Sequence, residues 1–230
     1  SNADGPMDLA NILKAGLDAD ESTMKSYMTK SMHLWGRRYQ HAGYGMKFYL
    51  WLARDDAKPY GSYGNGSAMR VSSVGLFFDS LERTREVARW SAELTHNHPE
   101  GIKGAESIAS VIWMARNGKS KDEIKSYIEK ECAYDLSRTC DQIRPGYRHI
   151  ESCMETCPEA ITVFLEGEDF EDVIRTAVSL GGDCDTLTDI AASMGEAFYG
   201  IPEQFKTWAY KFTTDSMHEV MNAFEEMVKS

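Results

Sequence analysis

Apolar residues recur at helical spacing along most of the chain. One set stands at i, i+3, i+4 and i+7: Ile108, Val111, Ile112 and Ala115. This spacing places apolar side chains on one face of a helix. No convincing alternation of apolar and polar residues, as in a half-buried strand, is present. The pattern predicts an all-α fold, a compact globular array of many short helices.

Glycines, prolines and capping residues divide this pattern into separate elements. The predicted helices span residues 20–38, 46–52, 68–78, 79–94, 100–118, 120–132, 158–165, 169–180, 185–199, 202–212 and 215–229. Residues 68–78 also fit a buried strand, although a helix is favoured. Residues 133–156 show no clear pattern, so we expect an irregular connection there.

Several helix starts are marked by their residue types. Asp79–Glu82 and Ser120–Glu123 resemble capping boxes, in which an acidic residue three positions on reaches back to the cap N–H. Asp169 is a predicted N-cap, and Pro158 suits the first position of a helix.

Composition and charge narrow the class of protein. The chain has 230 residues and a net charge of -11, which argues against a nucleic-acid surface rich in Lys and Arg. No apolar run reaches the roughly 20 residues of a membrane span, and the start lacks a secretory signal. The odd number of cysteines, five, favours reduced thiols and a cytoplasmic protein. Residues 1–3 are typical of a tag remnant, which leaves residues 4–230 as one predicted domain.

The first candidate site is the acidic stretch that begins at Gly181 and Gly182. Asp183, Asp185 and Thr186 form a compact set of hard oxygen donors, which suits Mg²⁺ better than zinc. Metal-activated water would make the two aspartates the candidate catalytic residues. The alternative is that the glycines end one helix and an aspartate caps the next.

The second candidate site is a glycine-rich loop. Its residues are Gly61, Ser62, Tyr63, Gly64, Asn65 and Gly66. Glycines permit close backbone approach, so successive N–H groups of this loop can hold a diphosphate, and the helix predicted to follow would add its positive end. Tyr63 can stack on a base or sugar, or simply pack. The alternative is an ordinary surface turn.

The third candidate is His96, within Thr95-His96-Asn97-His98-Pro99. Hydrogen bonding to a polar ligand is favoured over a zinc site with Cys153 and Cys157, because their spacing fits no common zinc pattern. Capping or packing is the alternative. No Ser-His-Asp, Walker or dinucleotide fingerprint is present.

The three stretches, in this order, closely resemble the ADP-ribosylglycohydrolase family, which includes the dinitrogenase reductase-activating glycohydrolases. The resemblance runs from about Trp35 to Tyr199. It implies an all-helical fold, a two-magnesium cleft, and hydrolysis of the glycosidic bond joining ADP-ribose to a protein side chain or small acceptor. It also implies that Asp183, Asp185 and Thr186 bind metal, that the loop binds ADP-ribose, and that His96 contacts the substrate.

The start of the chain departs from the family pattern. The family's first helix carries an acidic residue, and a Thr-Asp-Asp-Thr motif supplies further metal ligands; neither is found here, and Asp4 stands roughly where the later aspartate would fall. We therefore expect a domain that is truncated at its N-terminus relative to the family. A non-catalytic ADP-ribose-binding or regulatory module, and a structural or partner-binding helical protein, remain alternatives.

Overall fold

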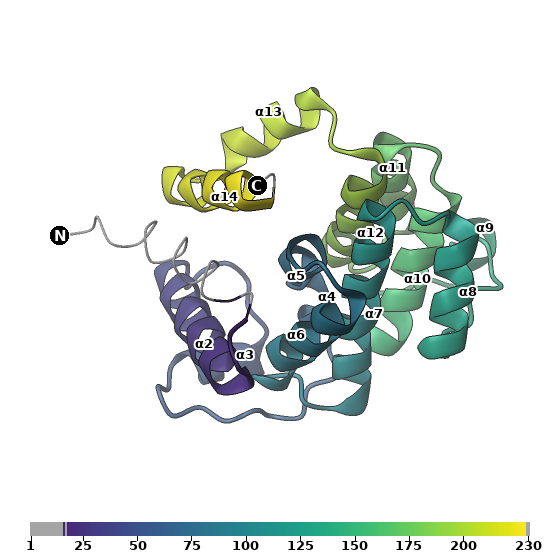
Figure 1. Ribbon diagram of the computed structural model, residues 1–230. Helices are drawn as coiled ribbons and strands as arrows, with labels where there is room; N and C mark the ends of the chain where they lie inside the picture. Colours follow the sequence, from purple (N-terminus) through teal and green to yellow (C-terminus); the bar gives the residue numbers. More distant parts are fainter. Residues whose placement is uncertain (1–15, 17, 229–230) are drawn as a thin grey trace.

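Helices make up the regular structure of this protein (Figure 1). The computed structural model describes residue 16 and residues 18–228, so residues 1–3 and Asp4 lie outside the described part. Within that part no strand occurs, and one isolated bridge pairs Gly64 with Ser152. The predicted all-α fold is confirmed.

The helices follow the expected order along the chain. They are α2 (Glu21–Arg38), α3 (Met46–Leu52), α4 (Gly66–Met69), α5 (Ser72–Phe77), α6 (Leu81–Glu93), α7 (Pro99–Arg116), α8 (Lys121–Glu131), α9 (Cys140–Ile143), α10 (Cys153–Glu166), α11 (Phe170–Leu180), α12 (Cys184–Tyr199), α13 (Glu203–Phe212) and α14 (Asp215–Val228).

Helix α7 forms the centre of the core. It packs against α4, α5, α6, α8, α10 and α12. The predicted apolar face is buried, with Ile108, Val111 and Ile112 fully shielded from solvent. Burying each such side chain contributes about 1.5–3 kcal/mol. Gly104 lets α10 come close, because a Cβ there would lie 2.4 Å from Cys153 Sγ.

Helix caps explain where several elements begin. The Ser120 and Glu123 capping box at α8 is confirmed, and Asp169 caps α11 by accepting from the Asp172 N–H at 2.8 Å. The predicted box at Asp79–Glu82 is wrong by one residue. Ser80 is the N-cap of α6, because its extended backbone lets the hydroxyl accept from the Arg83 N–H.

Two predicted stretches differ from the structure. Residues 68–78 form two short helices, α4 and α5, rather than one. The expected irregular connection at 133–156 contains α9 and the first turn of α10. Pro158 lies inside α10 rather than at its start, since the helix already begins at Cys153, whose N–H donates to Tyr63 O at 2.9 Å.

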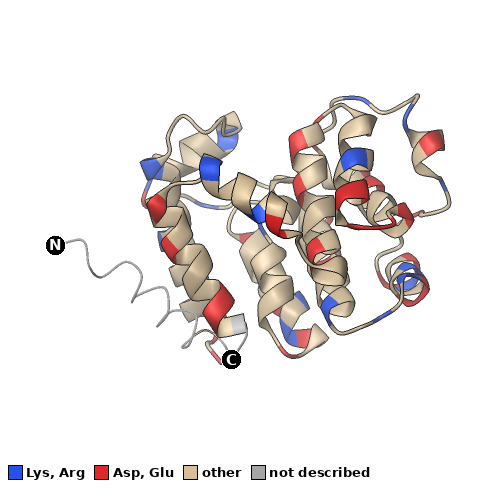
Figure 2. Ribbon diagram, turned by 90° about the horizontal axis from the view of Figure 1, so that it is seen from above, with Lys and Arg blue, Asp and Glu red and all other residues tan. Residues whose placement is uncertain are grey.

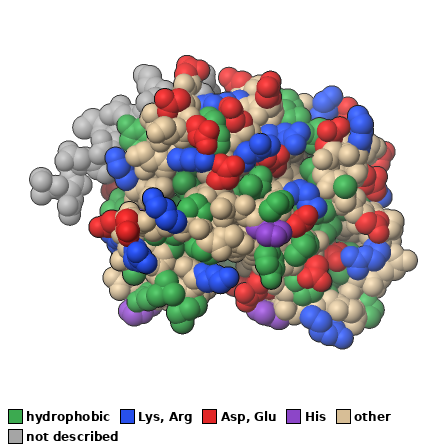
Figure 3. Space-filling view, turned by 90° about the horizontal axis from the view of Figure 1, so that it is seen from below, with side chains coloured by type: hydrophobic (Ala, Val, Ile, Leu, Met, Phe, Trp, Pro, Cys, Tyr) green, Lys and Arg blue, Asp and Glu red, His purple; other side chains and the backbone are tan. Residues whose placement is uncertain are grey.

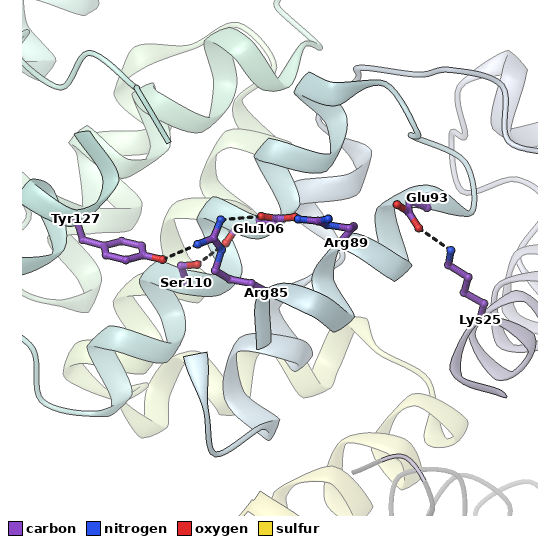
Figure 4. Close-up of polar contacts among 7 residues, drawn as sticks. All are labelled: Lys25, Arg85, Arg89, Glu93, Glu106, Ser110 and Tyr127. Carbon is purple, nitrogen blue, oxygen red and sulfur yellow. Dashed lines mark hydrogen bonds and ion pairs between the residues drawn. The ribbon is translucent and has the colours of Figure 1, made fainter. Parts of the chain in front are cut away.

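A buried carboxylate joins α6 to α7 (Figure 4). Glu106 accepts from Arg89 Nε at 2.7 Å and from Arg85 Nη2 at 3.0 Å, and Arg85 Nη1 donates to the Tyr127 hydroxyl at 3.3 Å. A buried carboxylate is tolerated only when it is paired in this way. The arginines therefore position α6 against the central helix.

The end of the chain returns towards its beginning. In Figure 1 α13 lies at the top, and α14 lies below it and above α2. The Tyr39 hydroxyl is 2.7 Å from Thr214 Oγ1, and Phe77 stacks on Phe224 with ring centroids 6.1 Å apart.

Charges of both signs are spread over the surface. Figure 2 shows Lys and Arg interspersed with Asp and Glu along the helices, and Figure 3 shows the same mixture, with hydrophobic side chains between, on the face seen from below. None of the helices described here is long and apolar enough to cross a membrane.

Candidate functional site

Two of the candidate stretches meet through one hydrogen bond. Asn65 Nδ2 donates to Asp183 Oδ2 at 2.7 Å, and the same amide nitrogen lies 3.2 Å from Thr156 Oγ1. Asn65 and Asp183 are each 7% exposed. Asp183 occupies the N-cap position of α12, but its side chain makes no capping hydrogen bond. The alternative of two helix caps is met in position, since Gly181 ends α11 and Asp183 precedes α12, but the Asp183 carboxylate bonds Asn65 rather than the N–H groups of the helix.

The glycine loop is fixed against the start of α10. The Asn65 N–H donates to Glu151 O at 2.7 Å, beside the Gly64–Ser152 bridge. At the other end of the loop, the Gly61 N–H donates to Asn97 Oδ1 at 2.8 Å. These contacts fix both ends of the loop, while Tyr63 in its middle stays at the surface.

These hydrogen bonds reduce the number of loop N–H groups that are free to bind a diphosphate. The N–H groups of Gly61, Gly64 and Asn65 already donate within the protein, that of Gly64 to Ser62 Oγ at 3.1 Å. The helix after the loop, α4, has only four residues, so its positive end is weak. Within the loop, the backbone donors of Ser62, Tyr63 and Gly66 are the ones that this pattern leaves.

Tyr63 lies on the exposed side of the loop. Its side chain is 51% exposed, and its ring meets the His98 ring edge to face at a centroid distance of 5.4 Å. An exposed aromatic ring of this kind can stack on a base or sugar. His98 itself caps α7, because its Nδ1 accepts from the Glu100 N–H at 3.2 Å. Of the two histidines, the capping role therefore belongs to His98.

His96 faces the inner side of the loop. Its Nε2 lies 3.2 Å from the position of a Cβ at Gly66 and 3.5 Å from one at Gly64, so side chains there would crowd the imidazole. Burial, and secondly the charge of Arg70, lower the pKa of His96 to about 3. At neutral pH His96 is therefore an uncharged hydrogen-bonding group beside the loop.

Gly182 allows the backbone to pass under a neighbouring segment. Its φ is +66°, and a Cβ there would lie 2.3 Å from Arg148 O and 2.8 Å from Tyr147 Cε1. Only glycine both adopts this positive φ readily and has no Cβ to clash with the neighbouring segment. Residues 147–151 were part of the expected irregular connection, so sequence reasoning missed that they close over the acidic stretch. No periodic signal marked them.

Asp185 and Thr186 stand in the first turn of α12, with Asp185 exposed. The pKa of Asp185 is lowered, and the main cause is the hydrogen bond that its carboxylate accepts from the Thr186 backbone N–H. The hydrogen bond with the Asp183 side chain is the second cause. Two carboxylates and a hydroxyl are oxygen donors of the kind that Mg²⁺ prefers. Across residue 16 and residues 18–228, no group of three or more His, Cys, Asp or Glu side chains is placed to hold a metal. The donors fit the ion in kind and would supply part of its coordination.

The cysteines considered for zinc are used in packing. Cys153 and Cys157 are both fully buried, and Cys153 Sγ donates to Gly64 O at 3.0 Å. Cys153 Sγ also lies 3.4 Å from Ser67 Oγ. These contacts connect α10 to the loop and to the helix that follows it.

Comparison with known proteins gives matches over nearly the whole chain. The ADP-ribosylglycohydrolase family matches residues 7–228. ADP-ribosylhydrolase ARH3 of Homo sapiens is 27% identical over 201 residues, which cover 68% of this chain and 55% of the relative. The ADP-ribosyl-dinitrogen reductase glycohydrolase of Rhodospirillum rubrum is 23% identical over 203 residues, covering 84% of this chain and 62% of the relative.

A solved structure described as an ADP-ribosylglycohydrolase-related protein complex has a similar fold. Its TM-score is 0.65 at 21% identity, over 97% of this chain and 80% of that chain. This chain spans about half the length of the ARH3 relatives that it matches, 55% for the human protein. Since the family match covers almost every residue, the chain belongs to the ADP-ribosylglycohydrolase family.

Proposed function

We propose that this protein binds ADP-ribosyl groups between the glycine loop and the acidic stretch, and hydrolyses their glycosidic bond to a protein side chain or small acceptor. The observation that carries the proposal is the Asn65–Asp183 hydrogen bond of 2.7 Å, which joins the two stretches. His96 faces the same loop from its inner side. Family membership supports this class of reaction.

The loop would hold the diphosphate and distal ribose through the N–H groups of Ser62 and Tyr63, with the exposed Tyr63 ring available for stacking. Asn65 would orient the Asp183 carboxylate by donating to Oδ2, which leaves Oδ1 for a ligand. The neutral His96 would contribute a hydrogen bond that does not depend on charge.

Asp183, Asp185 and Thr186 would hold Mg²⁺, which when bound supplies Lewis-acid stabilisation and a water of lowered pKa. Cleavage at the anomeric carbon passes through an oxocarbenium-like state, which a nearby pair of carboxylates stabilises. The role of Asn65 is then to keep one of these carboxylates in a single orientation.

The direct test is release of ADP-ribose. The chain is incubated with Mg²⁺ and peptides carrying ADP-ribosylarginine or ADP-ribosylserine, and free ADP-ribose is measured. We expect release that is abolished in Asp183→Asn and Asp185→Asn, whereas Asp122→Asn, at the exposed first turn of another helix, should leave it unchanged. No release from either linkage would contradict the hydrolase proposal.

A second candidate is a non-catalytic module that binds ADP-ribose. It is favoured by the limited metal-binding group: among the described residues no three His, Cys, Asp or Glu side chains are placed to hold a metal. Calorimetry with ADP-ribose, with and without Mg²⁺, separates the candidates. Binding without release would favour the module, and absence of both would contradict the two proposals together.

A further inference from the structure

A positively charged side chain lies behind His96 without a carboxylate beside it. Arg70 Nη2 donates to Ser91 O at 2.9 Å and to Thr95 Oγ1 at 2.8 Å, and its Nε is shielded from solvent with no partner. Within the described part of the chain no acidic group forms an ion pair with Arg70. Arg70 is half-buried, and leaving one of its N–H groups shielded from water without an acceptor is costly, so its position calls for a reason.

Thr95 connects Arg70 to His96 through its hydroxyl. A guanidinium has only donors, so Thr95 Oγ1 accepts from Arg70. The same hydroxyl oxygen lies 2.7 Å from His96 Nδ1. The hydroxyl keeps its proton and a second lone pair, so the contact with Nδ1 allows either direction. Donation from Thr95 to Nδ1 places the imidazole proton on Nε2.

The charge of Arg70 favours the same arrangement. A positive group near Nδ1 disfavours a proton on that nitrogen and attracts its lone pair. The other titratable group facing His96 is Tyr60, with ring centroids 6.0 Å apart, and burial raises the pKa of that phenol, so it stays neutral. Among the residues that the structure describes, no carboxylate forms an ion pair with His96.

We propose that Arg70 is a positioning residue which, through Thr95, holds His96 as the Nε2–H tautomer. His96 thereby presents a permanent neutral donor at the inner side of the loop, where Nε2 lies 3.2 Å from the Cβ position of Gly66. Such a donor suits a hydroxyl or phosphate oxygen of the ligand. That the ligand is ADP-ribose rests on the proposed function, whereas the tautomer itself does not.

The tautomer is measured directly by long-range ¹H–¹⁵N NMR correlations of the His96 ring in the full chain. We expect the Nε2–H form alone from pH 5 to 8, without titration. Thr95→Ser retains the hydroxyl and should keep this signature, whereas Thr95→Val has nearly the same shape and should lose it. Arg70→Met should give a mixture of tautomers and a His96 that titrates closer to its ordinary range.

Ligand affinity provides the second measurement. A lost hydrogen bond weakens ADP-ribose binding about 5- to 10-fold in Thr95→Val, with Thr95→Ser close to the original protein. An Nδ1–H form or a mixture in the original protein would overturn the proposal, as would identical spectra in the Ser and Val variants. If Arg70→Met does not fold, the comparison of Thr95→Ser with Thr95→Val still tests the proposal. Failure of ADP-ribose to bind, with the tautomer as expected, would contradict the proposed function alone.

Discussion

Asn65 and Asp183 are 118 positions apart in the chain, yet the amide nitrogen of one donates to the carboxylate of the other at 2.7 Å. Asn65 is the residue at which the glycine loop enters α4, and Asp183 is the residue before α12. One buried hydrogen bond therefore sets the distance between the part of the site that would hold a phosphate and the part that would hold a metal.

Replacing Asn65 should affect ligand binding and stability together. In Asn65→Ala the buried Asp183 carboxylate loses its donor, so we expect a loss of about 1–3 kcal/mol in the free energy of unfolding. ADP-ribose affinity in Mg²⁺ should fall about 10-fold, because the carboxylate loses its fixed orientation. Urea unfolding and calorimetry measure the two quantities.

The matched control is Asn117→Ala, at the exposed C-cap of α7, whose amide donates to Trp113 O. It should leave ADP-ribose affinity unchanged. Equal affinity in the Asn65 and Asn117 variants would show that the Asn65–Asp183 bond has no part in binding.

The elements themselves were largely predictable from the sequence. The spacing of Ile108 to Ala115 identifies a helix and its buried face, and Ser120 and Glu123 mark a helix start through local hydrogen bonds alone. Such signals depend on residues within one or two turns. The three candidate stretches were also recognisable, because each has an unusual local composition.

What brings those stretches together was not predictable in the same way. Arg70 lies in an apolar segment, and only the fold shows that its guanidinium reaches Thr95. Tyr147 and Arg148 lie in a segment without periodicity, and their contact with Gly182 depends on where α9 and α10 place them. These are long-range contacts, for which a single sequence carries no local signal.

Tyr63 should contribute to binding more than to folding. Its side chain is 51% exposed, so Tyr63→Ala should change the free energy of unfolding by less than about 1 kcal/mol. A ring that stacks on the ligand contributes about 1–3 kcal/mol to binding. Loss of that contribution should lower ADP-ribose affinity by about 5-fold or more. Tyr49→Ala, with a side chain 46% exposed on α3, is the control and should leave affinity unchanged. Equal losses of stability and affinity at Tyr63 would indicate a purely structural role.

Gly181 and Gly182 offer a matched pair, since both have positive φ, +75° and +66°. A Cβ at Gly181 meets nothing within 4 Å, so in Gly181→Ala only backbone strain, at φ +75° and ψ -146°, should lower the free energy of unfolding, by about 1–3 kcal/mol. A Cβ at Gly182 would lie 2.3 Å from Arg148 O, so Gly182→Ala should lose about 2 kcal/mol more. Urea unfolding of both variants compares them. A Gly182→Ala protein as stable as Gly181→Ala would mean that residues 147–148 move away easily.

Acidification should destabilise the protein in part through His96. The folded pKa of about 3 lies below the ordinary 6.5, so between these values the unfolded chain binds a proton that the folded one does not. Stability is therefore fully present above pH 6.5 and is lost as the pH falls towards 3, at about 1.4 kcal/mol per pH unit. Since the imidazole is 6% exposed, solvent screening removes little of this effect.

The measurement is the difference in the free energy of unfolding between the original protein and His96→Gln, whose amide does not titrate. That difference should be constant above pH 7. Below pH 6.5 the original protein should lose stability relative to His96→Gln, by on the order of 2 kcal/mol at pH 5. His149→Gln is the control with opposite sign, because the Glu151 carboxylate raises the pKa of the exposed His149. Its small contribution is present at low pH and is lost as the pH rises through that raised value. If His96→Gln and the original protein show the same pH dependence down to pH 4, then His96 is not held neutral in the folded protein, and its use as an uncharged donor beside the loop fails with it.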